Sequence, residues 1–155
     1  MRQKLAELKA ERERLLHLAS PKAVERQHSR GKMTARERIE YFYDPGTFLE
    51  LGLYAKPRIT GFDIDEQDLT GDGVITGSGT VQGRPVYAYA QDFTIAGGGQ
   101  GSVHAKKALR VMKQALKARV PCVHMIDSGG VRVQDAVTRD LADSYQLFFY
   151  YHTIS

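Results

Sequence analysis

The chain has 155 residues, of which 42% are hydrophobic and 26% charged, a composition that predicts one soluble globular domain. No apolar stretch approaches the roughly 18 residues of a membrane helix, so we expect no membrane partner. The net charge of +4 comes from residues 1–40, where 11 Lys/Arg face 6 Asp/Glu. Acidic residues interrupt this segment and no aromatic precedes Tyr41, which argues against nucleic acid. The single Cys122 permits no internal disulfide and agrees with a cytoplasmic location.

The first predicted element is a helix from Arg2 to about Ala19 that carries a narrow apolar stripe, formed by Leu5, Leu8, Leu15 and Leu16. A thin stripe on a charged helix indicates packing against the body or against a neighbouring subunit. Pro21 ends this helix because proline disfavours a helical residue before it. We expect residues 1–30 to form a helical arm and residues 31–155 to form the body.

The body should begin with a short helix. Thr34 and Glu37 have the spacing of a capping box, in which each side chain satisfies a main-chain N–H at the helix start. Asp44-Pro45-Gly46 ends this helix, and residues 47–54 form a candidate strand. One proline, two glycines and four acidic residues predict a loop over residues 56–71.

The next residues predict an alternation of strands and helices. Val74–Val81 and Val86–Ile95 are rich in β-branched and aromatic residues, and Gln82-Gly83 supplies the turn between them. The glycine segment "AGGGQGS" (residues 96–102) precedes a helix with apolar residues at helical spacing: Ala105, Ala108, Leu109, Met112, Ala115 and Leu116. Residues 121–126 predict a short buried strand before a second glycine turn. This order predicts an α/β fold.

The first glycine segment has two interpretations. A dinucleotide fingerprint would need glycine at position 104, which is His104, and the Lys-Ser/Thr pair of a phosphate loop is also missing. The segment is then either a flexible connection or a place where a ligand approaches the main chain at a helix N-terminus, where N–H groups favour anions. His104 is either a surface residue or a ligand contact.

The second glycine segment is "DSGG", residues 127–130. Ser128 lacks the glycine two places earlier that a nucleophile elbow requires. A Ser-His-Asp arrangement stays an alternative, for which the candidate histidines are His28, His104, His124 and His152. His124 lies in an apolar run and is expected in the core. Gly129 and Gly130 offer a pair of exposed main-chain amides, which can stabilise a developing oxyanion.

Four successive segments resemble the carboxyltransferase (β) subunits of biotin-dependent acyl-CoA carboxylases, most of all those of the propionyl-CoA carboxylase type. The segments are "GKMTARERIEYFYDPGTFLELG", "GDGVITGSGTVQGRPVYAYAQDFT", "GGGQGSVHAKKALRVMKQAL" and "DSGGVRVQDAV". They follow one another in the order of the family and cover residues 31–137. The turn departs from the family pattern, because Val131 and Asp135-Ala136 stand where Ala and Glu-Gly are usual.

The resemblance implies a crotonase-like α/β fold, a spiral of β-β-α units that is incomplete here and preceded by N-terminal helices. It implies carboxyl transfer from carboxybiotin to the α-carbon of an acyl-CoA. Gly129 and Gly130 would form the oxyanion hole, and no metal is expected. The acyl-CoA cleft would include residues of the first glycine segment and the helix start: Gly97, Gly98, Gly99, Gly101 and His104.

The resemblance also implies partners. Biotin would be carried by a biotin carboxylase or biotin carboxyl carrier subunit, and the full-length protein would be a homo-oligomer. Family chains carry a second, related domain, and the active site forms between the first domain of one subunit and the second of another. Residues 1–155 are therefore expected to be an N-terminal portion that is inactive alone. The alternatives are part of a biotin-dependent acyl-CoA decarboxylase, or a non-catalytic assembly piece that docks through its N-terminal helix.

Overall fold

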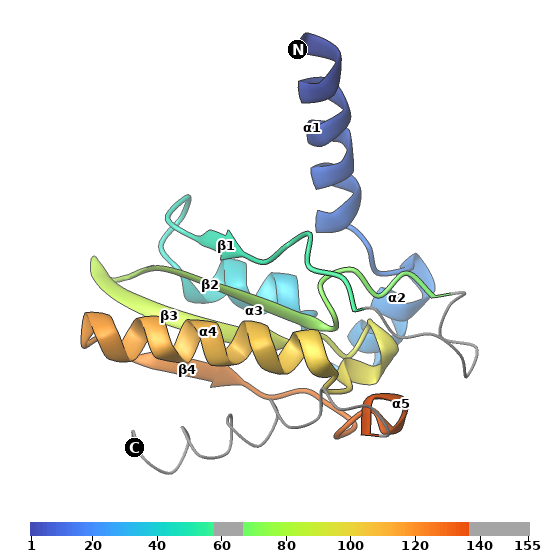
Figure 1. Cartoon of the computed structure of the whole chain (residues 1–155). Helices are drawn as coiled ribbons and strands as arrows, with labels where there is room; N and C mark the ends of the chain where they lie inside the picture. The colour runs from blue at the N-terminus through green and yellow to red at the C-terminus, as the bar shows by residue number, and fades with distance from the viewer. Residues whose placement is uncertain (58–66, 137–155) are drawn as a thin grey trace.

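A four-stranded sheet in the order β1-β2-β3-β4 forms the centre of the fold in a computed structural model that describes residues 1–57 and 67–136 (Figure 1). The strands are β1 (Leu49–Leu51), β2 (Val74–Val81), β3 (Arg84–Gln91) and β4 (Cys122–Met125). β1, β2 and β3 are antiparallel neighbours, whereas β4 pairs in parallel with β3. Parallel neighbours need a crossover, which helix α4 (Ser102–Ala118) supplies. The β2-β3-α4 unit confirms the predicted β-β-α layering.

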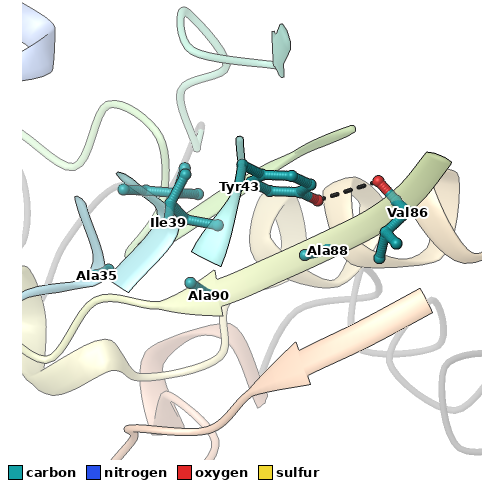
Figure 2. Packing of buried hydrophobic residues seen from close by; sticks show 7 residues of the cluster. Ala35, Ile39, Tyr43, Val86, Ala88 and Ala90 are labelled. Carbon is teal, nitrogen blue, oxygen red and sulfur yellow. Dashed lines mark hydrogen bonds between the residues drawn. The ribbon is translucent and has the colours of Figure 1, made fainter. Parts of the chain in front are cut away.

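The sheet is covered by a helix on each face, because successive residues of a strand point to opposite sides. On one face, helix α3 (Ala35–Phe42) contributes Ala35 and Ile39 to a cluster with Val86, Ala88 and Ala90 of β3 (Figure 2). On the other face, Tyr89 packs with the buried side of α4, formed by Ala108, Leu109, Val111 and Met112. Small alanines on β3 allow α3 to lie close to the sheet.

The tyrosine that follows α3 locks this helix to β3. Tyr43 is 4% exposed, and its hydroxyl donates to the main-chain oxygen of Val86 at 3.2 Å (Figure 2). Its ring stacks on Phe48 with centroids 5.0 Å apart, and burial raises the pKa of its hydroxyl. The capping box is confirmed at the other end of α3, where Thr34 and Glu37 satisfy each other's main-chain N–H.

The N-terminal arm consists of two helices. The predicted first helix is confirmed from Arg2, but its predicted end near Ala19 is wrong and the second helix was not predicted. Helix α1 (Arg2–Leu16) ends earlier, and helix α2 (Pro21–Ser29) follows at once. Ser20 caps α2 by accepting the N–H of Ala23 at 3.3 Å, and Pro21 occupies the first helical position, where proline is favoured. Pro21 therefore starts α2.

Helix α1 projects away from the sheet, and among the described residues it contacts the body through its last turn (Figure 1). Leu15 is 5% exposed and Arg14 pairs with Asp68 at 2.7 Å, but Leu5 and Leu8 are more than half exposed. The leucine stripe is thus only half covered, and its contact with a neighbouring subunit stays a prediction.

The predicted strands differ in detail from the observed ones. β1 covers three residues only and ends before Gly52, whose φ is +77°. β3 begins at Arg84, and Gln82 and Gly83 both have positive φ, as a two-residue hairpin turn prefers. The prediction that β4 is buried is wrong for Cys122, which is exposed at the start of a strand that pairs only with β3 among the described residues. Of the predicted loop, residues 58–66 lie outside the described residues.

The core on the α3 face yields a stability prediction. Ile39 is fully buried, so Ile39→Ala should lower the free energy of unfolding by about 2–5 kcal/mol, through lost apolar burial and an unfilled cavity. Tyr41→Ala on the same helix is the control, because Tyr41 is 86% exposed. Urea unfolding of both variants measures the difference. Equal losses would show that α3 does not pack as described.

Candidate functional site

The two glycine segments lie side by side and are joined through their main chains. The N–H of Gly129 donates to the oxygen of Gly97 at 2.9 Å, and the N–H of Gln100 donates to the oxygen of Gly130 at 2.8 Å. The N–H of Arg132 then donates back to the oxygen of Gln100 at 3.0 Å. Two junctions that are about 30 residues apart in the sequence therefore form one candidate site.

Two glycines of the first segment are required by packing. At Gly98, φ is +64° and a Cβ would overlap the main-chain oxygen of Asp127. At Gly101, a Cβ would lie 2.7 Å from Oδ2 of Asp72 and 2.8 Å from Nη2 of Arg132. At both positions the missing side chain allows the segments to approach each other, so folding alone explains these two glycines.

Three other glycines are not crowded by their neighbours to the same degree. Gly97 and Gly130 have φ of +64° and +117°, and a Cβ on either would meet nothing within 4 Å. At Gly129, φ is outside the left-handed region and the nearest atom to a Cβ would be the oxygen of Gly97, at an ordinary 3.7 Å. Neither backbone conformation nor packing within the described chain requires glycine at position 129.

A buried carboxylate lies beneath the first glycine segment. Asp72 is 0% exposed and its Oδ2 accepts the main-chain N–H of His104 at 2.7 Å. Its Oδ1 forms an ion pair with Arg132, whose Nη2 also donates to the oxygen of Gly99 at 3.1 Å. One of the two interpretations of the first glycine segment leaves the N–H groups at the start of α4 open to a ligand anion. The structure corrects this interpretation for His104, because an internal carboxylate occupies its N–H.

His104 is part of the core. Its side chain is 1% exposed, and Nδ1 lies 3.2 Å from the main-chain oxygen of Asp72. Burial, and next the charge of Lys107, lower its pKa to about 3, so the ring is neutral in the folded protein. The interpretation of His104 as a surface residue is therefore wrong. Its assignment to acyl-CoA binding stays a prediction, and so buried a ring would act by supporting the loop.

Lys107 is a buried lysine that the sequence analysis missed. Nζ donates to the main-chain oxygens of Gly71, at 2.8 Å, and Val74. Burial is the largest effect on its pKa and lowers it to about 8, although the charges of Glu50 and Asp72 oppose this shift. The helical spacing of the sequence could have indicated that Lys107 is buried, because Lys107 lies on the apolar face of α4, next to Ala108 and Val111.

The second glycine turn does not leave its two predicted oxyanion donors open. The N–H of Gly129 is held by the main chain of Gly97, as above, and the N–H of Gly130 donates to Oγ of Ser128 at 3.0 Å. Ser128 in turn donates to the oxygen of Gly98 at 2.7 Å. The amide of Gly130 is thus held only by a hydroxyl on an exposed turn, where another acceptor can replace it.

The described histidines do not form a catalytic triad with Ser128. His28 pairs with Glu37 at 2.9 Å, and His104 lies against Asp72. His124 stacks on Tyr89 with ring centroids 4.2 Å apart but is only half-buried, so the expected core position is met in part. Burial, then the charge of Arg38, lower its pKa to about 4. His152 lies outside the described residues.

Helix α2 is tied to the residue before the second turn. Gln27, 3% exposed, donates through Nε2 to Oδ2 of Asp127 at 2.6 Å, and Nζ of Lys32 lies 2.9 Å from Oδ1. Burial opposes ionisation of Asp127, but these hydrogen bonds outweigh it and lower the pKa of the carboxyl. The arm predicted for residues 1–30 therefore contacts the candidate site through α2, and the boundary at residue 30 stays a prediction.

A cavity of about 300 Å³ reaches Ile95, directly before the first glycine segment, but none of residues 127–130 lines it. Its walls come from the end of α1, from α3 and from the start of β2, and they carry four acidic residues: Glu37, Glu40, Glu50 and Asp92. Acidic walls disfavour the phosphates of a nucleotide. Within the described ranges, no group of three His, Cys, Asp or Glu side chains could hold a metal, and no helix is long and apolar enough to cross a membrane.

Comparison with known proteins places the sequence in a family. The model of the carboxyl transferase domain matches residues 26–155. The chain belongs to the carboxyl transferase family. It is 44% identical over 151 residues to the α subunit of methylmalonyl-CoA decarboxylase of Propionigenium modestum, and 46% identical over 134 residues to the propionyl-CoA carboxylase β chain of Saccharopolyspora erythraea. These matches cover 97% and 86% of this chain but only 29% and 24% of the relatives.

Comparison with solved structures leads to the same family. The crystal structure of transcarboxylase 12S, described as a hexamer assembly with methylmalonyl-coenzyme A bound, superposes on this chain with a TM-score of 0.92 and 38% sequence identity. It covers all of this chain, which spans 30% of the 12S chain. The predicted crotonase-like carboxyltransferase fold is confirmed. The chain spans less than a third of the length of these relatives.

The buried histidine predicts how stability depends on pH. His104 has a pKa of about 3 in the folded chain and 6.5 as the ordinary value, so between these pH values the unfolded chain binds a proton that the folded chain does not. The free energy of unfolding should therefore fall as the pH falls below about 6.5, with a slope up to about 1.4 kcal/mol per pH unit for this group. His104→Gln should reduce that slope in urea titrations at pH 5 and pH 7. An unchanged slope would contradict burial of a neutral imidazole.

Proposed function

We propose that this chain forms the acyl-CoA-binding part of a biotin-dependent carboxyltransferase, which moves a carboxyl group between carboxybiotin and the α-carbon of an acyl-CoA. The observation that carries the proposal is the superposition of the whole chain on transcarboxylase 12S, a structure with methylmalonyl-coenzyme A bound. The joined glycine segments support it, because they present main-chain donors on an exposed turn.

Gly130 is the better candidate of the two proposed oxyanion donors. Its N–H is held by the neutral hydroxyl of Ser128, whereas the N–H of Gly129 helps to join the two segments. A thioester oxygen that gains negative charge in the transition state would accept a charge-assisted hydrogen bond, about twice as strong as a neutral one. The thioester oxygen would therefore displace the Ser128 hydroxyl from the N–H of Gly130. Gly129 has no side chain and no closely packed neighbour, so the thioester could approach the turn there.

The first glycine segment would form the floor of the acyl-CoA cleft. Gly97 has open space where a Cβ would lie, so it is a better candidate for direct ligand contact than Gly98 or Gly101. At those two glycines, neighbouring atoms already occupy the space of a Cβ. Gly99 and His104 would act through the shape of the loop. On α4, Lys106 and Arg110 are exposed and would face either phosphates of CoA or solvent.

Biotin enters the proposal through a partner. Carboxybiotin, on a biotin carboxylase or carrier subunit, would supply the carboxyl group and, after losing it, the acceptor for the α-proton. The active site would form between the first domain of one subunit and the second domain of another, and no described residue is assigned to biotin. A homo-oligomer in the cytoplasm would complete the site, in keeping with the hexamer named for transcarboxylase 12S.

The second candidate is the reverse reaction, in a biotin-dependent acyl-CoA decarboxylase. It is favoured by the 44% identity to the methylmalonyl-CoA decarboxylase subunit over 97% of this chain. Both directions pass through the same negatively charged thioester oxygen, so the glycine turn serves either. The direction would follow from the partner subunits.

The oxyanion proposal predicts a large loss of turnover at Gly130. Residues 1–155 can be grafted onto the remaining part of the Propionigenium modestum relative. In this chimera, Gly130→Val should lower kcat by about 10²-fold or more, because an oxyanion donor acts mainly in the transition state. Ser128→Ala should cost far less, since its hydroxyl transfers no proton. Steady-state kinetics with propionyl-CoA or methylmalonyl-CoA measure both.

The control for the glycine variant is Gly83→Val in the β2–β3 turn. Gly83 has φ of +75°, against +117° at Gly130, and both have open space for a Cβ, so this variant also strains the backbone but away from the site. Thermal melts of each variant check folding. An inactive serine variant beside a nearly normal Gly130→Val would favour a nucleophilic serine and overturn the proposed role of the turn.

The shared-site proposal predicts that a polypeptide limited to residues 1–155 does not carboxylate propionyl-CoA or acetyl-CoA, even when free carboxybiotin is supplied. The reason is that the second domain would provide half of the site. Transfer of labelled carbon from the carboxyl group of carboxybiotin into the acyl-CoA is the measurement, with the chimera as positive control. Turnover by the short polypeptide would show that the half-site argument is wrong.

A further inference from the structure

Two cations converge on one aromatic ring beside the candidate site. The guanidinium carbon of Arg30 lies 5.9 Å from the ring centroid of Phe93, and Nζ of Lys32 lies 5.8 Å from it. Phe93 follows β3 and precedes the first glycine segment, and its ring is half-buried. The distances are those of cation–π contacts. The cluster formed by Arg30, Lys32 and Phe93 is here called the cation–aromatic cluster.

The position of the cluster is fixed relative to both glycine segments. Lys32 and Gln27 both bind the carboxylate of Asp127, which lies two residues before Gly129 and therefore within about 8 Å of it, Cα to Cα. On the other side, the main-chain nitrogen of Phe93 would lie 3.3 Å from a Cβ on Gly98. The cluster thus borders the turn and the loop that are proposed to hold the thioester.

The charge of the cluster is only partly compensated. Asp127 balances Lys32, and the carboxylate of Asp92, next to Phe93, accepts hydrogen bonds from Thr94. Arg30 is exposed at the end of α2, and no carboxylate of the described residues lies within ion-pair distance of it. One positive charge therefore stands beside an aromatic face with no fixed counter-charge.

We propose that the cation–aromatic cluster is an anion subsite for the acyl-CoA, in which Arg30 binds an anionic oxygen group and Phe93 packs against the ligand. This inference rests on the proposed function. The anionic group is either a phosphate of the nucleotide or the carboxylate of a carboxylated acyl group, which share the oxyanion chemistry that a guanidinium recognises. Arg30 contributes more than Lys32, because Asp127 already neutralises Lys32.

The test measures dissociation constants by calorimetry for the chimera with coenzyme A, adenosine 3′,5′-bisphosphate, propionyl-CoA and methylmalonyl-CoA. Arg30→Gln should weaken binding by about fivefold, the scale of an exposed ion pair, and the loss should shrink at high salt. Phe93→Leu should also weaken binding. Arg26→Gln is the matched control, because it removes the same charge from an exposed position of α2. Thermal melts check that each variant folds.

The ligands separate the sources of the anion. If Arg30→Gln loses affinity for coenzyme A and for adenosine 3′,5′-bisphosphate, the bound anion is a phosphate. If it loses affinity for methylmalonyl-CoA alone, the bound anion is the acyl carboxylate. If the parent chimera binds these compounds and Arg30→Gln binds them equally well, or if Arg26→Gln shows the same loss, the subsite is overturned and the proposed function stands. A parent chimera that binds none of them overturns both.

Discussion

The buried carboxylate of Asp72 is the constraint on which the candidate site depends. It caps α4 through the N–H of His104 and neutralises Arg132, which follows the second glycine turn. Lys107 fixes the same loop by binding the oxygens of Gly71 and Val74 on either side of Asp72. Removing one partner of a buried ion pair typically costs about 3–5 kcal/mol, because the other charge is left without compensation. One side chain thus joins the hairpin, the central helix and the turn.

This anchor separates the rigid part of the site from its exchangeable part. Gly101 must lack a side chain because Asp72 and Arg132 fill that space, and the oxygen of Gly99 is held by Arg132. Beyond these buried contacts, the turn itself is held by hydrogen bonds on the surface, among them the contact of Gly130 with Ser128. An anion can compete for a surface amide at little structural cost, whereas it cannot displace a buried ion pair.

The sequence predicted what local signals determine. The capping box of Thr34, the turn at Gln82-Gly83 and the buried face of α4 depend on residues within a few positions of one another, and these local predictions are confirmed. The prediction is wrong only for Leu116 at the end of the α4 face, which is 49% exposed. Asp72 and Arg132 are 60 residues apart, so no pattern revealed their contact. Sequence patterns also show that a glycine is present without showing whether packing, a positive φ or a ligand requires it. The engaged amides of the turn were missed for the same reason.

The relatives of this chain act in opposite directions of carboxyl transfer. The chain is 44% identical to a decarboxylase subunit and 46% identical to a carboxylase chain, so these residues do not distinguish the two. A donor such as Gly130 would lower the energy of the charged thioester oxygen, through which both directions pass, and would accelerate both equally. A catalytic turn of this kind cannot set the direction of transfer. If the proposed function holds, the direction is determined by what removes or supplies the carboxyl group, which lies outside the residues described.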